Sequence, residues 1–236
     1  MTNREAEDLA VRIRALALET GAELVGFASA AEMNKGAPKG HRPSDLLKSS
    51  KSMITLACGR SLNEDRDYVY HWGPIYSLTY IQLKGEVRWR RKEARGSMEA
   101  VSNLLRQEGW KAVTEPHGWS GILSFKTAAY LGGLGVLGKG NFLLHPELGP
   151  LNILACIVTD AQLKYDEPLN ANVCKDCFQC IKACKYGAFK KQGDCFKWFG
   201  DKCRCYDLIM NPVTLKWTYG PCNSECVNAC PIGKEK

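Results

Sequence analysis

Long hydrophobic runs are missing from this chain of 236 residues. No stretch reaches the roughly 18 consecutive apolar residues that a membrane-spanning helix needs, because Lys126 interrupts the longest candidate. The amino terminus begins MTNREAEDLAVRIR and lacks the apolar segment of a secretory signal peptide. We therefore expect a cytoplasmic protein.

A strong compositional bias is also absent. Hydrophobic residues make up 45% of the chain and charged residues 24%, with a formal net charge of +7. These values exclude a disordered chain, a collagen and a disulfide-rich miniprotein. A chain of this length buries about 70% of the surface that its unfolded form exposes, which is enough for one large domain or a domain with an appendage.

Cysteine is scarce in the first 160 or so residues, where only Cys58 and Cys156 occur, both in apolar runs typical of buried positions.

Helical spacing of apolar residues predicts helices over residues 5–20, 76–108 and 122–131, with a short helix from Pro43. Short apolar runs predict strands over residues 23–28, 52–58, 111–114 and 152–159, the last in the interior of a sheet. This order of elements predicts an α/β or α+β core.

Ten of the 12 cysteines lie between Cys174 and Cys230. In a reducing cytoplasm, thiols at this density are metal ligands more often than disulfides. The segment has few periodic apolar residues, so metal binding would supply folding energy. A polar stretch that starts with Asp166 separates it from the rest, which predicts a first domain over residues 1–165 and a second over residues 166–236.

The cysteine spacing is typical of a bacterial ferredoxin, except that Lys185 stands where proline usually follows the fourth cysteine. Three closely spaced thiolates can hold three irons of a 4Fe-4S cluster, while the fourth cysteine points to a second cluster. The first cluster is then expected to take Cys174, Cys177, Cys180 and Cys230. The second is expected to take Cys184, Cys222, Cys226 and one of Cys195, Cys203 and Cys205, of which we favour Cys195.

Zinc and disulfides are the alternatives for these cysteines. Zinc sites usually come as separated cysteine pairs, whereas four cysteines in one short run crowd a single tetrahedral ion.

Two clusters, each with about two negative charges, would lower the net charge from +7 to about +3. Lysines in this segment would then steer an acidic electron donor, which makes nucleic acid a less favoured partner. They are Lys175, Lys182, Lys185, Lys190, Lys191 and Lys197.

A glycine-rich loop, GLGVLGKGN, occupies residues 133–141. It does not match a dinucleotide-binding loop, because it follows an expected helix, nor a phosphate-binding loop, because Gly140 replaces the required hydroxyl residue. A turn at the end of a helix would need only Gly132 and Gly133. The further glycines let the backbone approach a large flat or anionic ligand closely, so we expect a ligand-binding loop.

These segments together resemble epoxyqueuosine reductases and, more distantly, reductive dehalogenases. The similar segments are the glycine-rich loop, the turn His145-Pro146-Glu147-Leu148-Gly149, the strand end Ile157-Val158-Thr159-Asp160 and the two-cluster cysteine pattern. Upstream, residues 41–47 and 51–54 are similar to the family's approach to an early strand, and Arg66-Asp67-Tyr68 with His71 is similar to its Arg-Asp-Tyr-His segment.

The resemblance implies a corrinoid iron-sulfur reductase of α+β fold class. A nitroreductase-like α/β sandwich domain would bind cobalamin base-off, and a C-terminal ferredoxin-like domain with two 4Fe-4S clusters would pass electrons to cobalt. A carrier such as ferredoxin or flavodoxin would supply those electrons. The corrin would contact Gly133, Leu134, Gly135, Val136, Leu137, Gly138, Lys139, Gly140 and Asn141.

Two departures from the family bear on activity. Trp119 occupies the place of the family's proton-donating aspartate, which leaves His117 and Tyr68 as candidate catalytic acids. A surface or core role is the alternative for His117, and Tyr76 and Tyr80 are further possible donors. The chain ends six residues after Cys230, so we also expect a short form without the family's C-terminal tRNA-binding extension.

Three functions are compatible with these features. The first is reduction of a small electrophile by an enzyme that carries cobalamin and two clusters. The second is non-catalytic electron transfer or corrinoid carriage, and the third is an epoxyqueuosine-type reduction of tRNA.

Overall fold

The structure, a computed structural model of the chain, describes residues 2–58, 69–70, 81–82, 86–115, 122–151, 153–192, 195–199, 201–203, 208–210, 217–219 and 225–233. Its largest sheet has four antiparallel strands in the order β1-β2-β9-β5. The strands are β1 Leu24–Ser29, β2 Ser52–Cys58, β9 Ile153–Thr159 and β5 Ala112–Glu115. A helix long and apolar enough to cross a membrane does not occur within these ranges.

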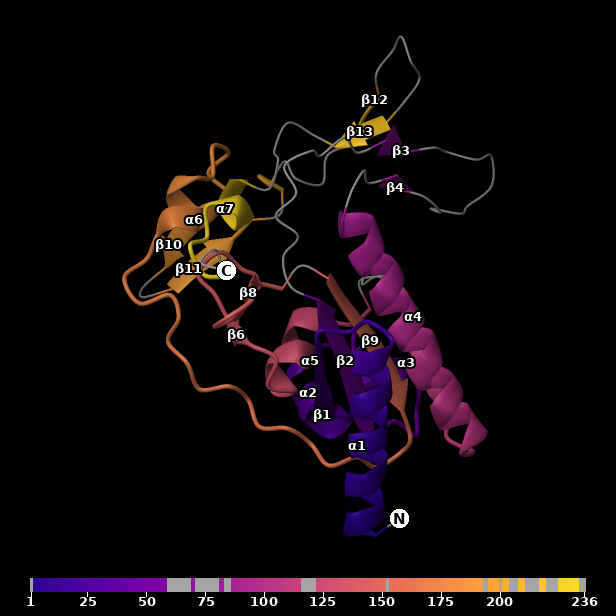
Figure 1. Cartoon of the computed structure of the whole chain (residues 1–236). Coiled ribbons are helices and arrows are strands. Elements are labelled where there is room, and N and C mark those ends of the chain that lie inside the picture. Colours follow the sequence, from indigo (N-terminus) through magenta and orange to yellow (C-terminus); the bar gives the residue numbers. More distant parts are fainter. Residues whose placement is uncertain are drawn as a thin grey trace.

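Helices cover both faces of this sheet (Figure 1). Helix α1, Asn3–Glu19, and helix α4, Glu86–Gln107, pack on one face, where Ile13 and Leu105 are fully buried. The other face is covered by α2, Ala30–Gly36, α3, Pro43–Leu46, and α5, Phe125–Leu131. The result is a three-layer α/β/α sandwich.

Side-chain alternation along the two central strands explains the two layers. In β2, Ile54 and Leu56 point to the α1 and α4 side, while Met53 between them points to the α2 and α5 side. In β9, Ile157 and Val158 divide in the same way, and all five side chains are fully buried. Because successive residues of a strand face opposite sides, a continuous apolar run fills both halves of the core.

Local sequence signals begin and end the helices that frame the site. Thr2 and Glu5 form a capping box at the start of α1. The Ser124 hydroxyl accepts a hydrogen bond from the Thr127 backbone N–H and so begins α5. Gly132 caps the end of α5 and leads directly into the glycine-rich loop.

The loop and the C-terminal segment form smaller elements. Strands β6 Val136–Leu137, β7 Leu143–His145 and β8 Gly149–Pro150 make a three-stranded sheet. The C-terminal segment contains helices α6 Gln179–Lys182 and α7 Glu225–Asn228, which contact each other, and the hairpin of β10 Phe189–Gln192 with β11 Cys195–Trp198. A fourth sheet has the order β12-β13-β3-β4, with strands Leu208–Met210, Trp217–Tyr219, Val69–Tyr70 and Ile81–Gln82.

The predicted elements of the first 160 residues agree with the structure in type, and β9 is interior, between β2 and β5. The long helix expected over residues 76–108 is wrong at its start, because Ile81–Gln82 is strand β4 and helix α4 begins only at Glu86. The helix expected from residue 122 begins at Phe125, because Ser124 caps it. The ferredoxin-like fold of the C-terminal segment stays a prediction, as does a domain boundary at residue 165.

Asp166 attaches the connecting segment to the sheet. Its carboxylate accepts two hydrogen bonds of 2.8 Å from the Arg14 guanidinium and one of 2.8 Å from the Phe27 backbone N–H. Its own N–H donates to the Phe27 carbonyl over 2.9 Å, so residue 166 extends the pairing of β1. The start of the connecting segment is therefore held on the main sheet.

Gly26 in β1 should be intolerant of any side chain. A Cβ atom there would collide with the Gly132 carbonyl oxygen and approach the Leu134 Cδ2 atom to 2.9 Å. We expect Gly26→Ala to destabilise the fold by about 1–3 kcal/mol in urea unfolding, because the strand and the turn after α5 must separate. Gly36→Ala is the matched control, because a Cβ atom there meets nothing within 4 Å. Equal unfolding free energies for the two variants would contradict this account of the packing.

Candidate metal centre

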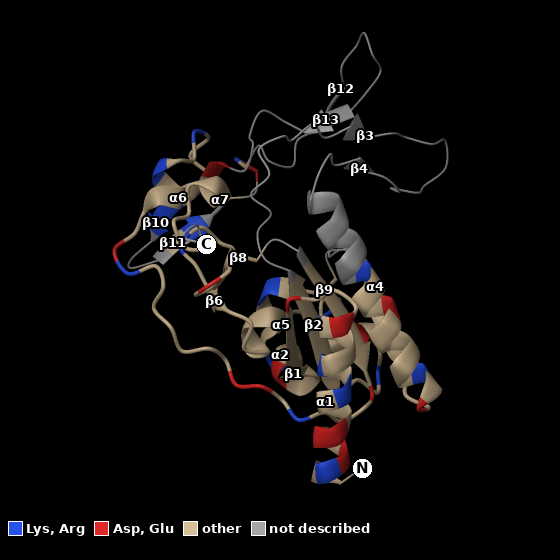
Figure 2. Cartoon of the chain, in the orientation of Figure 1, with Lys and Arg blue, Asp and Glu red and all other residues tan. Residues whose placement is uncertain are grey.

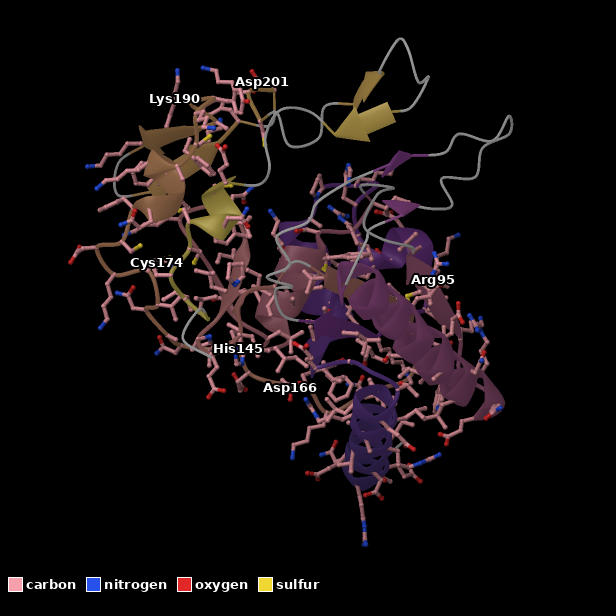
Figure 3. All side chains as sticks on the ribbon, turned by 45° about the horizontal axis from the view of Figure 1, so that its top comes forward. Arg95, His145, Asp166, Cys174, Lys190 and Asp201 are labelled. Atoms are coloured by element: carbon pink, nitrogen blue, oxygen red, sulfur yellow. The ribbon has the colours of Figure 1, made fainter. Side chains whose placement is uncertain are left out.

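A small cavity between the C-terminal segment and the glycine-rich loop is lined by four cysteines. They are Cys174, Cys177, Cys180 and Cys230. These are the four residues expected to hold the first cluster, and they come from positions as far apart as 174 and 230. Figure 3 shows Cys174 on the C-terminal side of the molecule, with His145 at the end of β7 and Asp166 beyond it.

Local backbone structure places each thiol. The Cys177 N–H donates to the Cys174 carbonyl over 2.7 Å, which closes the first turn of the cysteine loop. Lys175, inside that turn, has a φ of 34°, which few residues other than glycine adopt. Cys180 lies on α6, and Cys230 follows α7 with its N–H bonded to the Val227 carbonyl.

The thiols of this cavity interact electrostatically. Burial, together with the neighbouring Cys174, Cys230 and Cys177, raises the pKa of Cys180 from 9.0 to about 11. Negative charges that repel one another in a partly buried site are stable only if cations neutralise them. Metal binding supplies those cations and displaces the thiol protons.

The grouping of the thiols bears on the choice between a cluster and a single ion. Within the part of the chain that the structure describes, no three His, Cys, Asp or Glu side chains are grouped to hold one metal ion. The four cysteines line one common cavity. This grouping suits a cluster in which each thiolate binds a different iron better than it suits one tetrahedral zinc. Occupancy by iron stays a prediction.

The opposite wall of the cavity is the glycine-rich loop with the strand that follows it. Gly140, Phe142 and Leu144 line the same space as the four cysteines. A Cβ atom on Gly140 would lie 3.1 Å from the Cys180 sulfur and would collide with the Phe142 ring. Any larger residue at position 140 would therefore force the Phe142 ring, and to a smaller extent Cys180, to shift.

The other glycines of the loop face the protein itself. Added Cβ atoms would lie 2.6 Å from the Glu167 carbonyl oxygen at Gly133, 2.5 Å from the Leu144 carbonyl oxygen at Gly135 and 2.6 Å from the Leu144 Cδ1 atom at Gly138. The expectation that these glycines make room for a large ligand is therefore not needed to explain them. Close packing of the chain accounts for all three, and their contact with a corrin stays a prediction.

Two lysines fix the position of the loop. The Lys139 ammonium group donates a hydrogen bond to the Lys175 carbonyl and lies 4.1 Å from the centre of the Phe178 ring, so this side chain reaches the cysteine loop. The Lys126 ammonium group on α5 donates to the Asn141 carbonyl over 2.7 Å, and burial lowers the pKa of Lys126. Asn141 has a φ of 59°, a left-handed conformation that asparagine tolerates.

Sequence reasoning missed Lys126, Phe178 and Asp166 as residues that shape the site. Lys126 was only an interruption of an apolar run, although a lone lysine among buried residues of a helix is itself a signal of a specific partner. Asp166 was part of an expected linker. Its partners, Arg14 and Phe27, are more than 130 positions away, so no local pattern could identify them.

The turn between β7 and β8 lies against the residues that follow Cys230. The turn between β7 and β8 is closed by the His145 Nδ1 atom, which accepts hydrogen bonds of 3.2 Å from the backbone N–H groups of Glu147 and Leu148. Gly149 has a φ of 72° and lies directly against the Ile232 carbonyl, so a side chain there is excluded. The turn similar to the family's His-Pro-Glu segment thus supports the residues just after Cys230.

The second predicted cluster is only partly described. The Cys184 sulfur accepts a hydrogen bond from the Ala188 N–H over 3.4 Å, and Lys185 pairs with Glu225 over 2.6 Å, which brings the ends of α6 and α7 together beside Cys184 and Cys226. Cys203 is half-buried. Cys222 and Cys205 lie outside the described residues, as does the side chain of Cys195. The ligand set of this cluster stays a prediction.

The candidate proton donors also lie outside the described residues. This holds for His117 and Tyr68 and for the alternatives Tyr76 and Tyr80. Their roles stay predictions.

Comparisons with known proteins confirm the predicted resemblance. No protein-family model matches the chain. Curated epoxyqueuosine reductases of Staphylococcus aureus and Listeria monocytogenes are 31% and 34% identical to it over 74 residues. Each alignment covers 31% of this chain and 19% of the relative, so the chain matches less than a fifth of the length of these relatives.

Solved structures extend the likeness to nearly the whole chain. The epoxyqueuosine reductase of Bacillus subtilis has a TM-score of 0.66 at 19% identity, covering 97% of this chain and 66% of that one. A catabolic reductive dehalogenase in complex with 3-bromo-4-hydroxybenzoic acid has a TM-score of 0.58 at 16% identity, covering 99% and 33%. The chain therefore shares the fold of these proteins.

Replacing Cys230 should remove one cluster. In protein purified without oxygen we expect Cys230→Ser to lower the iron content by about four atoms per chain, because a 4Fe-4S cluster uses all four thiolates of this cavity. Cys156→Ser is the control, because Cys156 is fully buried in the sheet, away from this cavity. Stoichiometric zinc in place of iron in the unsubstituted protein would overturn the cluster assignment.

The metal-free protein should lose stability at high pH. The folded-state pKa of Cys180 is raised from 9.0 to about 11, so the stabilisation by its neutral thiol is present below pH 9 and is lost as the pH rises through 11. We expect thermal unfolding in chelator and reductant to show this decline, and Cys180→Ser to remove the part of it due to this thiol. Identical pH profiles for the two proteins would contradict the assigned shift.

Proposed function

We propose that the protein is an oxidoreductase whose C-terminal segment carries two 4Fe-4S clusters and passes electrons to a corrinoid on the first domain, for reduction of a small electrophile. One observation carries this proposal. The four cysteines Cys174, Cys177, Cys180 and Cys230 line a cavity whose opposite wall is the glycine-rich loop of the first domain. An electron on such a cluster would thus be next to the first domain.

The residues of the cavity fit an iron-sulfur cluster. Four thiolates are the ligands that such a cluster takes, and Phe142, Leu144 and Ile232 form an apolar lining that limits contact with water. Exclusion of water lowers the local dielectric constant and so influences the reduction potential. Lys139 would contribute a positive charge close to the cysteine loop.

The described residues test a corrinoid site less directly. The glycines of the loop are packed against protein, so the loop offers a ligand its backbone and the side chain of Leu137, which is 55% exposed. An exposed leucine in the glycine-rich loop is compatible with an apolar contact. Support for the corrinoid comes mainly from the shared fold, because one neighbour is described as a reductive dehalogenase with a mechanism for B12-dependent dehalogenation. When bound, a corrinoid supplies the reducing metal, while the protein positions it.

Reduction of tRNA is the second candidate function. One structural neighbour is an epoxyqueuosine reductase with an epoxyqueuosine-modified tRNA stem loop, at a TM-score of 0.65 and 18% identity. Binding of a stem loop to this chain would fall steeply with salt, because phosphate contacts release counterions. Non-catalytic electron carriage is less favoured, because the relatives named above are reductases.

Cofactor content tests the proposal. Protein prepared without oxygen and reconstituted with iron, sulfide and cobalamin should contain about eight irons and about one cobalt per chain, with EPR signals of reduced clusters and base-off Co(II). Leu137→Asp should lower cobalt retention and leave iron unchanged, because a charge would disfavour an apolar contact. Val11→Asp is the control, because Val11 on α1 is 62% exposed and lies away from the loop. Failure of the unsubstituted protein to retain any corrinoid would overturn the corrinoid part.

A further inference from the structure

Three lysines of the C-terminal segment surround one aromatic ring. The ammonium groups of Lys190, Lys197 and Lys202 lie 5.7, 5.3 and 5.9 Å from the centre of the Phe199 ring. We call these four residues the lysine patch. Lys190 and Lys197 face each other across the β10–β11 hairpin, where they are cross-strand partners, and Lys202 follows in the next turn. All three lysines are exposed, and Figure 2 shows the blue residues of this region.

The lysine patch differs from the lysines that form ion pairs elsewhere in the protein. Lys185 pairs with Glu225, Lys164 with Glu7 and Lys35 with Glu32. Among the described residues, none of the three patch ammonium groups has a carboxylate partner, although exposed Asp201 lies near Lys190 at the same end of the segment (Figure 3). Like charges held on one ring repel one another, and an anionic surface would relieve that repulsion.

The lysine patch lies beside a predicted ligand of the second cluster. The Phe199 N–H donates to the Ala188 carbonyl over 2.8 Å, and the Ala188 N–H donates to the Cys184 sulfur over 3.4 Å. Two backbone hydrogen bonds thus connect residue 199, whose ring is at the centre of the patch, to Cys184 through Ala188. Lys202 is also adjacent in sequence to Cys203, another candidate ligand.

The structure also orders the two cluster sites. The four-cysteine cavity faces the glycine-rich loop through Gly140, Phe142 and Leu144. Cys184 follows Cys180 by four residues, and the hydrogen bond to its sulfur comes from the side of the β10–β11 hairpin. An electron that enters at the patch would therefore meet the second cluster first and the first domain last.

We infer that the lysine patch is the docking surface for an acidic one-electron carrier protein, of the ferredoxin or flavodoxin kind. The inference rests on the proposed function and adds the point of electron entry. Each encounter oxidises the carrier by one electron and reduces the second cluster by one electron, without bond changes. Complementary charge raises the rate of such encounters, and this increase becomes smaller as the salt concentration rises.

A nucleic acid fits this patch less well than an acidic protein. Single-stranded nucleic acid is held by base stacking on open aromatic faces together with basic side chains. The Phe199 ring is half-buried and has three lysine ammonium groups around it, so it does not offer an open stacking face.

The test compares two triple variants with equal loss of charge. Lys190→Gln, Lys197→Gln and Lys202→Gln remove the patch, and Arg4→Gln, Lys39→Gln and Lys48→Gln remove three exposed charges from the first domain. Reconstituted protein is mixed by stopped flow with reduced flavodoxin or with photoreduced deazaflavin, and cluster bleaching is followed. We expect the patch variant to react about tenfold more slowly with flavodoxin at low salt, with a difference that disappears at high salt. Its rate with deazaflavin should be unchanged, and the control variant should differ by less than about twofold from the unsubstituted protein in both reactions.

Each other outcome is decisive. Equal slowing by both triple variants, or no slowing by either, overturns the inference, as does loss of tRNA stem-loop binding by the patch variant with an unchanged flavodoxin rate. If the protein incorporates no iron, the proposed function is contradicted before any rate is measured. In that case, binding of labelled flavodoxin to the same variants, measured by fluorescence anisotropy, still shows whether the patch docks an acidic protein.

Discussion

A Cβ atom at residue 140 would lie 3.1 Å from the Cys180 sulfur and would displace the Phe142 ring, so glycine at this position lets the glycine-rich loop and the cysteine loop approach each other closely. This close approach joins two parts of the chain with different chemistry, a sandwich held by its apolar core and a cysteine segment with little core of its own. The cavity exists because the two parts share a wall. Electron transfer between them, as proposed, depends on that proximity.

Several independent contacts hold this wall together. Asp166 attaches the start of the connecting segment to β1 by hydrogen bonds. Gly149 packs directly against the carbonyl of Ile232, which follows the last cysteine. Lys139 reaches from the glycine-rich loop to the carbonyl of Lys175 inside the cysteine loop. Both the start and the described end of the C-terminal segment thus contact the N-terminal part of the chain, and the four cysteines of the cavity are brought to one place. Such pre-positioning lowers the entropy lost when the cluster assembles.

The distribution of charge changes from the exposed hairpin to the cavity. Lys190 and Lys197 lie on the exposed hairpin, Lys185 is neutralised by Glu225, and two of the four cavity cysteines, Cys180 and Cys230, are buried. If two clusters are present, the formal charge of +7 falls to about +3. Among the described residues, the patch lysines have no carboxylate partner, so positive charge remains exposed at the patch. The inner site would then be governed by burial and the outer site by attraction over longer distances.

Local patterns in the sequence determined the strands β2 and β9, the capped helix α1, and the four cysteines that line the cavity. The strands and the helix depend on apolar periodicity or on neighbouring capping residues, which act over a few residues, while the cysteine set depends on ligand spacing in two short runs and on the pattern that relates them. The start of α4 could not be read in this way, because the pairing of β4 with β3 overrides helical preference at residues 81–82. Only the tertiary structure decided what the glycines face and where Lys139 and Asp166 bind, because the absence of a side chain permits a close approach without naming the segment that makes it. That choice depends on how distant segments pack, and no short stretch of sequence contains it.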